Sequence, residues 1–298
     1  MTDAVIVVGS LNVDLIVRVP HLPTPGETVT GGTYARTPGG KGANQAAAAA
    51  RLGAPTWIVG VVGDDDLGRE TRADLEARGV DLSQLRSGTA HTGVAAIMVD
   101  EGGENLIAVA SGANAELSPA MVSESIAAIP VDRAVVLANL EIPDDAVLAA
   151  ADCARQHAWR FVLNPAPPRA LSAELLATCD VLIPNEHEVT SLGPPDADAL
   201  LAAGVGAVVV TRGSAGADLH HADAPIVHQG AFPVAAVDTT GAGDAFCAAF
   251  AWALAEGLAE GRALQLAAAA GALATRAVGA RESLPDRAEI EGIAGSER

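Results

Sequence analysis

The sequence predicts an α/β protein, with a three-layer α/β/α domain built on a mostly parallel central sheet and a small additional β-sheet. Short continuous apolar runs alternate with helical patterns along most of the 298 residues, which is typical of strands that helices cover on both faces. Two stretches have strand patterns without helices beside them, and these predict the additional sheet. Half of the residues are apolar, which is enough for one large core.

The main elements follow in chain order from periodicity and turn signals. Strands are expected at residues 4–8, 56–62, 134–140, 160–163, 181–184 and 207–211, which are continuous apolar runs. Helices are expected at residues 44–52, 67–78, 144–157, 244–256 and 261–278. In the fourth of these helices, Phe246, Phe250 and Trp252 are expected to pack in the core.

The additional sheet is expected to come from two insertions, at about residues 12–38 and 92–110, into a single domain of residues 1–298. In the second insertion, residues 94–99 and 106–109 are strand-like and flank a turn, which is the pattern of a hairpin. A partly exposed sheet beside an α/β domain is well placed to act as a lid over a ligand crevice.

Charge and cysteine content exclude several classes of partner. The formal net charge is −19 and no basic run is present, which disfavours nucleic acids and anionic membrane surfaces. The most apolar helix, at residues 245–255, is shorter than the roughly 20 residues that span a bilayer. The three cysteines are far apart and the N-terminal residues do not resemble a signal peptide, so a cytoplasmic protein is expected.

The stretch PGGKGANQ, residues 38–45, contains the only lysine in the chain. One interpretation is chance, because lysine drifts to arginine in a sequence this rich in Ala and Arg. The other is that Lys41 is required, since an ammonium is a compact charge on a flexible stem and a guanidinium is a wide planar fork. A narrow, glycine-lined site for a hydroxyl or phosphate group would select the lysine.

A second glycine-rich stretch, at residues 236–246, has the order strand, glycine turn and helix start. The first N–H groups of a helix have no partner inside it and bind anions such as phosphate, which glycines allow to approach the backbone. Asp244 at this helix start can be a first-turn acid that stabilises the helix. Alternatively, it is a general base that takes the proton of a substrate hydroxyl during phosphoryl transfer.

Other patterns for nucleotide binding are not found in the chain. It has no GxxxxGK[ST] sequence, no GxGxxG after the first strand, and no HRD or DFG sequence. These observations disfavour P-loop enzymes, dinucleotide-dependent dehydrogenases and protein kinases.

Together the motifs resemble the ribokinase (PfkB-type) family of carbohydrate kinases, over essentially the whole chain. The residues that carry the resemblance are, in order, Gly9-Ser10-Leu11-Asn12-Val13-Asp14, Gly39-Gly40-Lys41-Gly42-Ala43-Asn44-Gln45, Asn164-Pro165-Ala166-Pro167, Asn185-Glu186-His187-Glu188 and Asp238-Thr239-Thr240-Gly241-Ala242-Gly243-Asp244. Two signatures at the right separation, with smaller motifs between them, are highly specific. GGKGAN and NPAP are closer to the ribose-specific branch than to the fructokinase or adenosine kinase branches.

The resemblance implies a ribokinase-like fold and a role for each matching residue in an acceptor site. The sugar would be held by Asn12, Asp14, Gly39, Gly40, Lys41, Asn44 and Glu141. Asp244 would contact the sugar and act as the catalytic base. The N–H groups of Gly241, Ala242 and Gly243 would form the anion hole for the phosphoryl group.

The resemblance also implies a donor site and two kinds of cation. ATP would lie near Asn185, Glu188, Thr211, Gly213 and Gly216, with Mg²⁺ near Glu188 through water. A monovalent cation, K⁺, would be held by Asp238, Thr240, Gly279 and Ser283 and would hold the anion-hole loop in place. Within residues 275–283 the chain departs from the family pattern by one additional residue between the Thr-Arg and Gly-Ala pairs.

The favoured interpretation is ATP-dependent phosphorylation of D-ribose at O5, which yields ribose 5-phosphate and ADP. Two alternatives stay open: the same chemistry on another sugar or nucleoside, such as deoxyribose, fructose or adenosine, and a sugar sensor without catalysis. An intact Asp244 with both glycines argues against the sensor. A homodimer through the lid sheet is also expected, because apolar residues such as Val94 and Ile97 would otherwise be uncovered.

Overall fold

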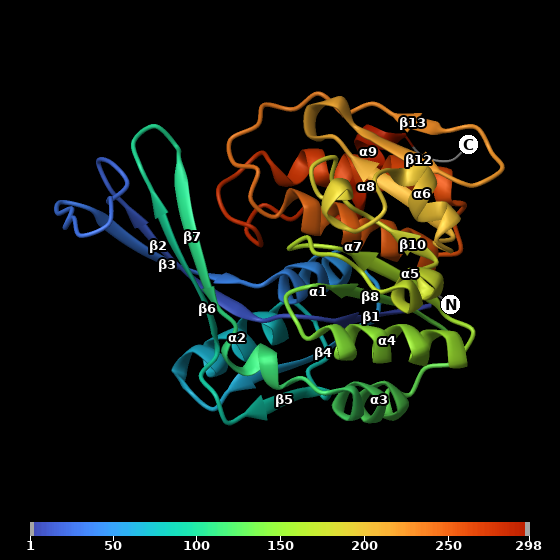
Figure 1. Ribbon diagram of the computed structural model, residues 1–298, viewed down its shortest axis with the longest axis horizontal. Coiled ribbons are helices and arrows are strands. Elements are labelled where there is room, and N and C mark those ends of the chain that lie inside the picture. The colour runs from blue at the N-terminus through green and yellow to red at the C-terminus, as the bar shows by residue number, and fades with distance from the viewer. Residues whose placement is uncertain (1–2, 296–298) are drawn as a thin grey trace.

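A nine-stranded sheet lies at the centre of the structure, a computed structural model that describes residues 3–295 (Figure 1). In spatial order its strands are β13 (Val227–Gln229), β12 (Ala217–His220), β11 (Ala207–Thr211), β10 (Val181–Leu182), β9 (Arg160–Asn164), β8 (Ala134–Asn139), β1 (Ala4–Val8), β4 (Thr56–Gly63) and β5 (Leu85–Gly88). Neighbouring strands from β11 to β5 are parallel, and β12 and β13 add an antiparallel edge. The mostly parallel sheet expected from the sequence is confirmed.

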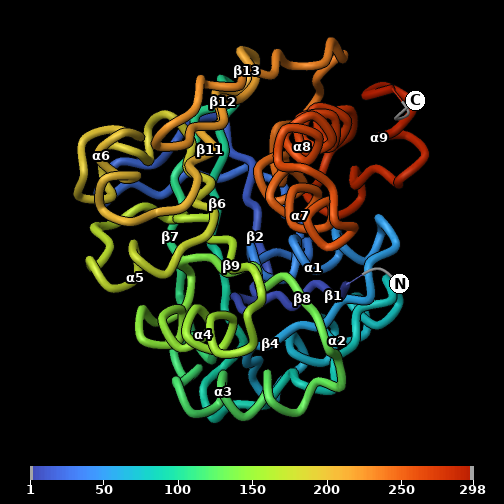
Figure 2. The backbone as a smooth tube through the Cα atoms, turned by 90° about the vertical axis from the view of Figure 1, so that its right-hand side faces the viewer, coloured from blue at the N-terminus to red at the C-terminus, as the bar shows by residue number. Residues whose placement is uncertain are grey.

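Helices lie on both sides of this sheet, as Figure 2 shows. The helices on one side are α1 (Lys41–Arg51), α2 (Asp66–Ala77), α7 (Ala242–Ala255), α8 (Glu260–Ala274) and α9 (Arg287–Ala294). Those on the other side are α3 (Pro119–Ala128), α4 (Asp144–Gln156), α5 (Ala173–Thr178) and α6 (Ala197–Ala202). In β1, Val5 and Val7 join the first core, whereas Ile6 and Val8 join the second. A strand buried on both faces needs an apolar residue at every position, which explains the continuous runs in the sequence.

A second sheet of four strands projects from one side of the main body (Figure 1). Its spatial order is β3 (Thr33–Gly39), β2 (Asn12–Arg18), β6 (Gly93–Val99) and β7 (Asn105–Ala110). The expected hairpin is confirmed, because β6 and β7 pair antiparallel across the turn that follows Val99. Val94 and Ile97 are only partly exposed, whereas Leu106, Ile107 and Val109 of β7 are exposed. The uncovered apolar surface therefore lies mainly on β7 and not at the residues expected.

Two helices begin earlier than expected because a glycine turns the chain immediately before them. α1 begins at Lys41 and not at residue 44, after Gly40 with φ of 88°. α7 begins at Ala242 and not at residue 244, after Gly241 with φ of 78°. A positive φ is open to glycine and costly for other residues. The last residues of each glycine motif therefore form the first turn of a helix.

α8 ends earlier than expected, at Ala274 and not at residue 278. The carbonyl oxygen of Thr275 accepts the N–H groups of Val237 (2.7 Å) and Asp238 (3.1 Å), so it is not available to a further helical turn. This contact joins the end of α8 to the loop before α7.

The shorter elements α3, α5, α6, α9, β5, β12 and β13 were not predicted from the sequence. Within residues 3–295, no helix has the length and apolar character that a membrane crossing requires.

Candidate active site

The expected site residues gather at one edge of the main sheet, where its parallel strands end. Glu141 follows β8, Asn164 ends β9 and Thr211 ends β11. Asn185 is joined to Thr211 by an isolated β-bridge. The second sheet starts at the same edge, because β2 begins at Asn12 directly beyond the end of β1. This is where open α/β sheets bind ligands.

Asp244, the expected base, is buried in the first turn of α7 and is held by two side chains of α1. Asn44 Nδ2 donates to one carboxylate oxygen (2.9 Å), and Gln45 Nε2 donates to the other (3.1 Å). Because each of its two oxygens accepts a hydrogen bond, the carboxylate has a fixed orientation. A base that must meet one particular hydroxyl benefits from such a fixed orientation.

Gln45 is a site residue to which the sequence analysis assigned no role, although it completes the first signature. Its side chain is fully buried, and Nε2 also donates to Asn164 Oδ1 (3.1 Å). Asn164, from the NPAP motif, donates in turn to the carbonyl oxygen of Ile183 (3.2 Å). These amides connect the ends of β9 and β10 to the base. The position of Gln45 directly after GGKGAN is the signal that could have identified it.

Glu141 Oε2 accepts hydrogen bonds that bring three parts of the chain together. The donors are the backbone N–H of Lys41 (3.1 Å), the Ser10 hydroxyl and, at the longer distance of 3.4 Å, Asn12 Nδ2. Ser10 is buried beyond the end of β1 and was not among the expected site residues. Asn12, Lys41 and Glu141, which were expected to hold a sugar, are thus direct neighbours.

Asn114 fixes the start of the second sheet. It is buried in the short 3-10 helix η1 (Gly112–Glu116), where it accepts the Leu11 N–H (2.8 Å) and donates to the Leu11 carbonyl oxygen (3.1 Å). It also donates to Asn12 Oδ1 (2.8 Å), so the Asn12 amide turns its nitrogen toward Glu141. This role was not predicted, because Asn114 lies outside both glycine signatures.

The carboxylate of Asp14 in β2 lies against Gly39. A Cβ atom at position 39 would be 2.2 Å from a carboxylate oxygen of Asp14, so a larger residue there would displace this carboxylate. Burial raises the pKa of Asp14 to about 6; Glu141 and Asp244 add to this increase, and the positive charge of Arg281 opposes it. Asp14 therefore lies close enough to Glu141, Asp244 and Arg281 for their charges to change its pKa.

Lys41 is the first residue of α1 and is surrounded by carboxylates. Burial acts to lower the pKa of Lys41, but the charges of Asp244, Glu141 and Glu188 outweigh it and raise the pKa above the usual value of lysine. The ammonium therefore keeps its charge. In return, the positive charge of Lys41 opposes the increase that burial causes in the pKa of Glu188. Lys41 thus links the expected sugar-binding residues with a residue expected near the nucleotide.

The start of α7 offers backbone N–H groups to an anion. A Cβ atom at Gly241 would lie 2.8 Å from Ala280, and its φ is positive, so this turn requires glycine. The N–H of Ala242 already donates to the carbonyl oxygen of Thr239 (3.2 Å). Among the three amides expected to form an anion hole, Gly241 and Gly243 are therefore the two best placed to bind a ligand.

A pocket of about 560 Å³ adjoins the start of α7. Its lining includes all three residues Thr211, Gly213 and Gly216 that were expected to border a nucleotide. The other lining residues are Ser214, Ala231, Phe232, Pro233, Val234, Ala236, Thr239, Ala242, Gly243, Phe246, Ala268, Gly271, Ala272 and Thr275. Small and apolar walls with a polar end at a helix start suit a flat ring that carries an anionic group.

Asn185 and Glu188 form a closed pair that does not line this pocket. Glu188 Oε2 accepts the Asn185 N–H (2.8 Å), and Asn185 Oδ1 accepts the Glu188 N–H (2.8 Å). Both side chains are partly exposed, so they remain accessible to a solvated metal ion. The charge of Lys41 acts on Glu188, so this pair lies close to the residues that were expected to hold a sugar.

The four residues expected to hold a monovalent cation lie together. Asp238 Oδ1 accepts the Thr240 N–H (2.9 Å) and hydroxyl (2.7 Å), and Asp238 Oδ2 accepts the Gly279 N–H (3.0 Å). The Ser283 hydroxyl donates to the Gly279 carbonyl oxygen (2.7 Å). Burial acts to raise the pKa of Asp238, but these donors outweigh it and lower the pKa below its usual value. A charged carboxylate among carbonyl and hydroxyl oxygens is a set of donors that fits a hard cation.

Comparisons with known proteins agree with the family resemblance and the fold. Residues 2–287 match the family described as pfkB family carbohydrate kinase. A ribokinase from Bacillus subtilis (strain 168) is 41% identical over 295 residues, which are 96% of this chain and 98% of that protein. A deoxyribokinase from Salmonella typhi is 36% identical over 82% of this chain and 83% of its own length.

A solved structure shows the same similarity. The structure of Arabidopsis thaliana ribokinase complexed with ribose and ATP matches with a TM-score of 0.88 and 34% sequence identity, over 100% of both chains. The protein belongs to the pfkB family of carbohydrate kinases.

Proposed function

We propose that the protein transfers the γ-phosphoryl group of ATP to O5 of D-ribose. The observation that carries this proposal is the position of Asp244. Its carboxylate is held by Asn44 and Gln45 on the acceptor side, and it lies in the helix turn whose Gly243 lines the pocket of about 560 Å³. A general base at the boundary between a polar acceptor site and an anion-binding helix start is the arrangement that phosphoryl transfer to a hydroxyl requires.

On the acceptor side, the sugar is bound by hydroxyl-accepting and hydroxyl-donating groups. Asp14, Glu141 and Asn12 face the same region as Lys41, and this combination suits the closely spaced hydroxyls of a free pentose. The O5 proton passes to the Asp244 carboxylate while O5 forms its bond to the γ-phosphorus and the bond to the ADP oxygen breaks. The Gly241 and Gly243 amides and the Lys41 ammonium stabilise the charge on the phosphoryl oxygens.

On the donor side, ATP lies in the pocket bordered by Thr211, Gly213 and Gly216. Mg²⁺ supplies charge neutralisation between the phosphates, and Glu188 with Asn185 would hold it through water. The Asp238 cluster fits K⁺ by its oxygen donors, and the ion would stabilise the loop that precedes α7.

The four-stranded sheet is a lid and a dimer contact in this proposal. Ile107 and Val109 of β7 line a second cavity of about 560 Å³ together with Asn12 and Glu141, so the sheet borders the acceptor site. Leu106, on one face of β7, and Ile107 and Val109, on the other, are also 46%, 58% and 52% exposed, which is unusual for apolar residues without a partner. A homodimer would cover them, and Leu106→Lys should shift the mass in solution from dimer to monomer.

The protein would work in the cytoplasm, since its three cysteines are buried free thiols.

The experiment that tests the proposal is an ADP-release assay with purified protein, ATP and Mg²⁺, in K⁺ or in Na⁺. The acceptors are D-ribose, 2-deoxyribose, fructose, adenosine and inosine. Fastest turnover on ribose, with further activation by K⁺, is the expected result. Preference for another acceptor would overturn the substrate and keep the chemistry. Binding of ribose without any turnover would identify a sensor.

A further inference from the structure

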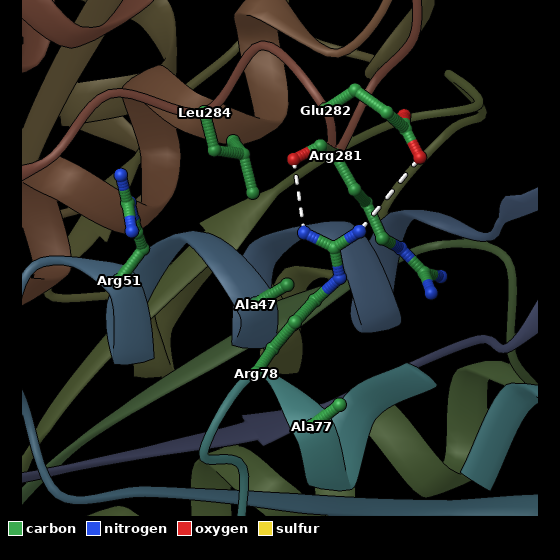
Figure 3. A pocket seen from close by; sticks show the side chains of 7 residues that line it. All are labelled: Ala47, Arg51, Ala77, Arg78, Arg281, Glu282 and Leu284. Carbon is green, nitrogen blue, oxygen red and sulfur yellow. Dashed lines mark hydrogen bonds and ion pairs between the residues drawn. The ribbon is translucent and has the colours of Figure 1, made fainter. Parts of the chain in front are cut away.

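Arg281 is a buried charged side chain to which none of the motifs assigns a function. It is 1% exposed, and it lies in the segment between the end of α8 and the start of α9. Figure 3 shows it in the wall of a pocket of about 420 Å³, where its backbone carbonyl oxygen accepts a hydrogen bond from Arg78 (3.1 Å). Its guanidinium extends away from this pocket. The arginine therefore acts elsewhere.

The guanidinium of Arg281 contacts three parts of the chain that meet at the acceptor site. Nε donates to Asn44 Oδ1 (2.9 Å), and one terminal nitrogen donates to the carbonyl oxygen of Gly39. The other terminal nitrogen forms an ion pair with Asp74 of α2 (2.6 Å). A buried arginine destabilises the fold unless its charge and its donors are paired. Here two of the donors are paired with Gly39 and Asn44, which belong to the first glycine signature.

The contact with Asn44 determines how that side chain meets the base. An Asn amide has an oxygen on one side and a nitrogen on the other. Because Arg281 can only donate, it holds the oxygen, and the nitrogen is left to donate to Asp244 (2.9 Å). Without Arg281, the amide could turn over or move, and the carboxylate would lose one of its two fixed donors.

Arg281 also changes the electrostatics of the acceptor site. The charged groups that act on Asp14 are Glu141, Asp244 and Arg281, and only Arg281 favours the ionised form. It therefore extends the pH range over which Asp14 is a carboxylate that accepts sugar hydroxyls. Arg281 also lies in the chain between Gly279 and Ser283. The Gly279 N–H donates to the Asp238 carboxylate, and the Ser283 hydroxyl donates to the Gly279 carbonyl oxygen.

We propose that Arg281 is a positioning residue of the acceptor site, which orients Asn44 toward Asp244 and supplies the positive charge beside Asp14. This inference rests on the proposed function. A purely structural role, as a fastener between α2 and the C-terminal segment, predicts a loss of stability without selective effects on the sugar.

Two substitutions separate the geometry of Arg281 from its charge. Arg281→Lys keeps the charge but loses the guanidinium fork that reaches Asn44 and Gly39 together. The kcat should therefore fall by up to about 100-fold. The pH at which sugar affinity weakens should stay near that of the wild type, because the charge is kept. Arg281→Gln removes the charge as well as the fork. The kcat should fall, and the pH below which sugar affinity weakens should move to a higher value than in the wild type. In both variants the KM for ATP should be unchanged, because no contact of Arg281 reaches the nucleotide pocket.

Arg72→Gln is the matched control, because Arg72 is a partly buried arginine of the same helix as Asp74, and its guanidinium donates to the Leu85 carbonyl oxygen (3.0 Å) and the Ser87 hydroxyl (3.2 Å). It should lower the melting temperature and leave kcat and sugar affinity unchanged. Asp74→Asn is the second test, which serves if the Arg281 variants do not fold. It leaves Arg281 in place with one anchor weakened, so a smaller fall in kcat and sugar affinity, with unchanged KM for ATP, is expected.

The outcomes are distinct from those that test the proposed function. Wild-type sugar kinetics in Arg281→Lys and Arg281→Gln, or in Asp74→Asn alone if the other two do not fold, would overturn the proposal. So would an equal loss of sugar and ATP affinity. If the wild type shows no turnover on any acceptor, the proposed function fails, and calorimetric sugar binding by the same variants at several pH values still decides the role of Arg281.

Discussion

Asn44 and Asp244 are joined by a hydrogen bond of 2.9 Å although 200 positions separate them in the chain. The bond connects the two glycine signatures, since Asn44 lies in the first turn of α1 and Asp244 in the first turn of α7. Two helix starts that face each other bring a sugar-binding motif to an anion-binding motif. In the proposed function, this arrangement would bring an acceptor hydroxyl beside the transferred phosphoryl group.

Asp244→Asn should reduce kcat by about 10²–10⁴-fold, the usual contribution of a general base. Ribose affinity measured by calorimetry should change little, because the amide keeps one oxygen for Asn44 or Gln45. Asp66→Asn is the matched control, since Asp66 is also a first-turn acid but lies at α2, away from the site. If Asp244 were only a first-turn acid that stabilises its helix, both variants would lose a little stability and keep their turnover.

Lys41→Arg should reduce kcat by at least about tenfold, as expected when a preorganised donor is displaced. Lys41 lies among the carboxylates of Asp244, Glu141 and Glu188, and the wide guanidinium fork cannot take the place of a point charge there. Steady-state kinetics with ribose and ATP measure the effect. Arg36→Lys, on the exposed side of β3, is the control and should have no effect. Unchanged kinetics in Lys41→Arg would mean that the single lysine survived by chance.

Asp14→Asn should make the protein more stable while it weakens sugar binding. The pKa of Asp14 is raised from 3.8 to about 6 in the folded state, so folding favours the protonated form and the ionised side chain destabilises the fold. This penalty grows as pH rises from about 4 to 6 and is fully present above pH 6. The variant should therefore gain about 2–3 kcal/mol at pH 7 to 8 and nothing below pH 4.

Urea unfolding at several pH values measures the gain in Asp14→Asn. Asp64→Asn is the control, because that side chain is 86% exposed, and it should show no gain at any pH. An Asp14→Asn protein that is less stable than the wild type at pH 8 would contradict the predicted penalty. In the wild type, the same titration should weaken ribose affinity as pH falls through about 6, because protonated Asp14 loses charge and acceptor capacity.

The expected fold and much of the expected site could be read from the sequence because both depend on local patterns. Continuous apolar runs identified strands such as β1 and β8, and glycine motifs marked the starts of α1 and α7. Elements without such signals were missed. β13 has three residues, two of them exposed, and α5 and α6 have six each, so neither periodicity nor propensity distinguishes them from loops.

The missed site residues have a different physical reason. Gln45, Asn114 and Arg281 act through contacts with residues far away in the sequence, such as Arg281 with Asn44 across 237 positions. Their side chains are polar and common in loops or helices, so nothing local marks them as buried. Only the packing of α1 against α7, of η1 against the start of β2, and of the C-terminal segment against α1 reveals their partners. The end of α8 at Ala274 was missed for the same reason, because the donors that stop it come from Val237 and Asp238.

Asp238→Ala should remove the response of the enzyme to K⁺. Asp238 bonds to Thr240 before α7 and to Gly279 after α8, so its carboxylate joins the two loops that flank the anion-binding helix start. Loss of the cation and of these bonds should lower kcat in K⁺ to the level that the wild type shows without K⁺, with ribose affinity nearly unchanged. Glu282→Gln, an exposed acid in the same segment, is the control and should keep the K⁺ response. A wild type that is insensitive to K⁺, or an Asp238→Ala variant that still responds, would show that the cluster of four residues is a structural turn and not a cation site.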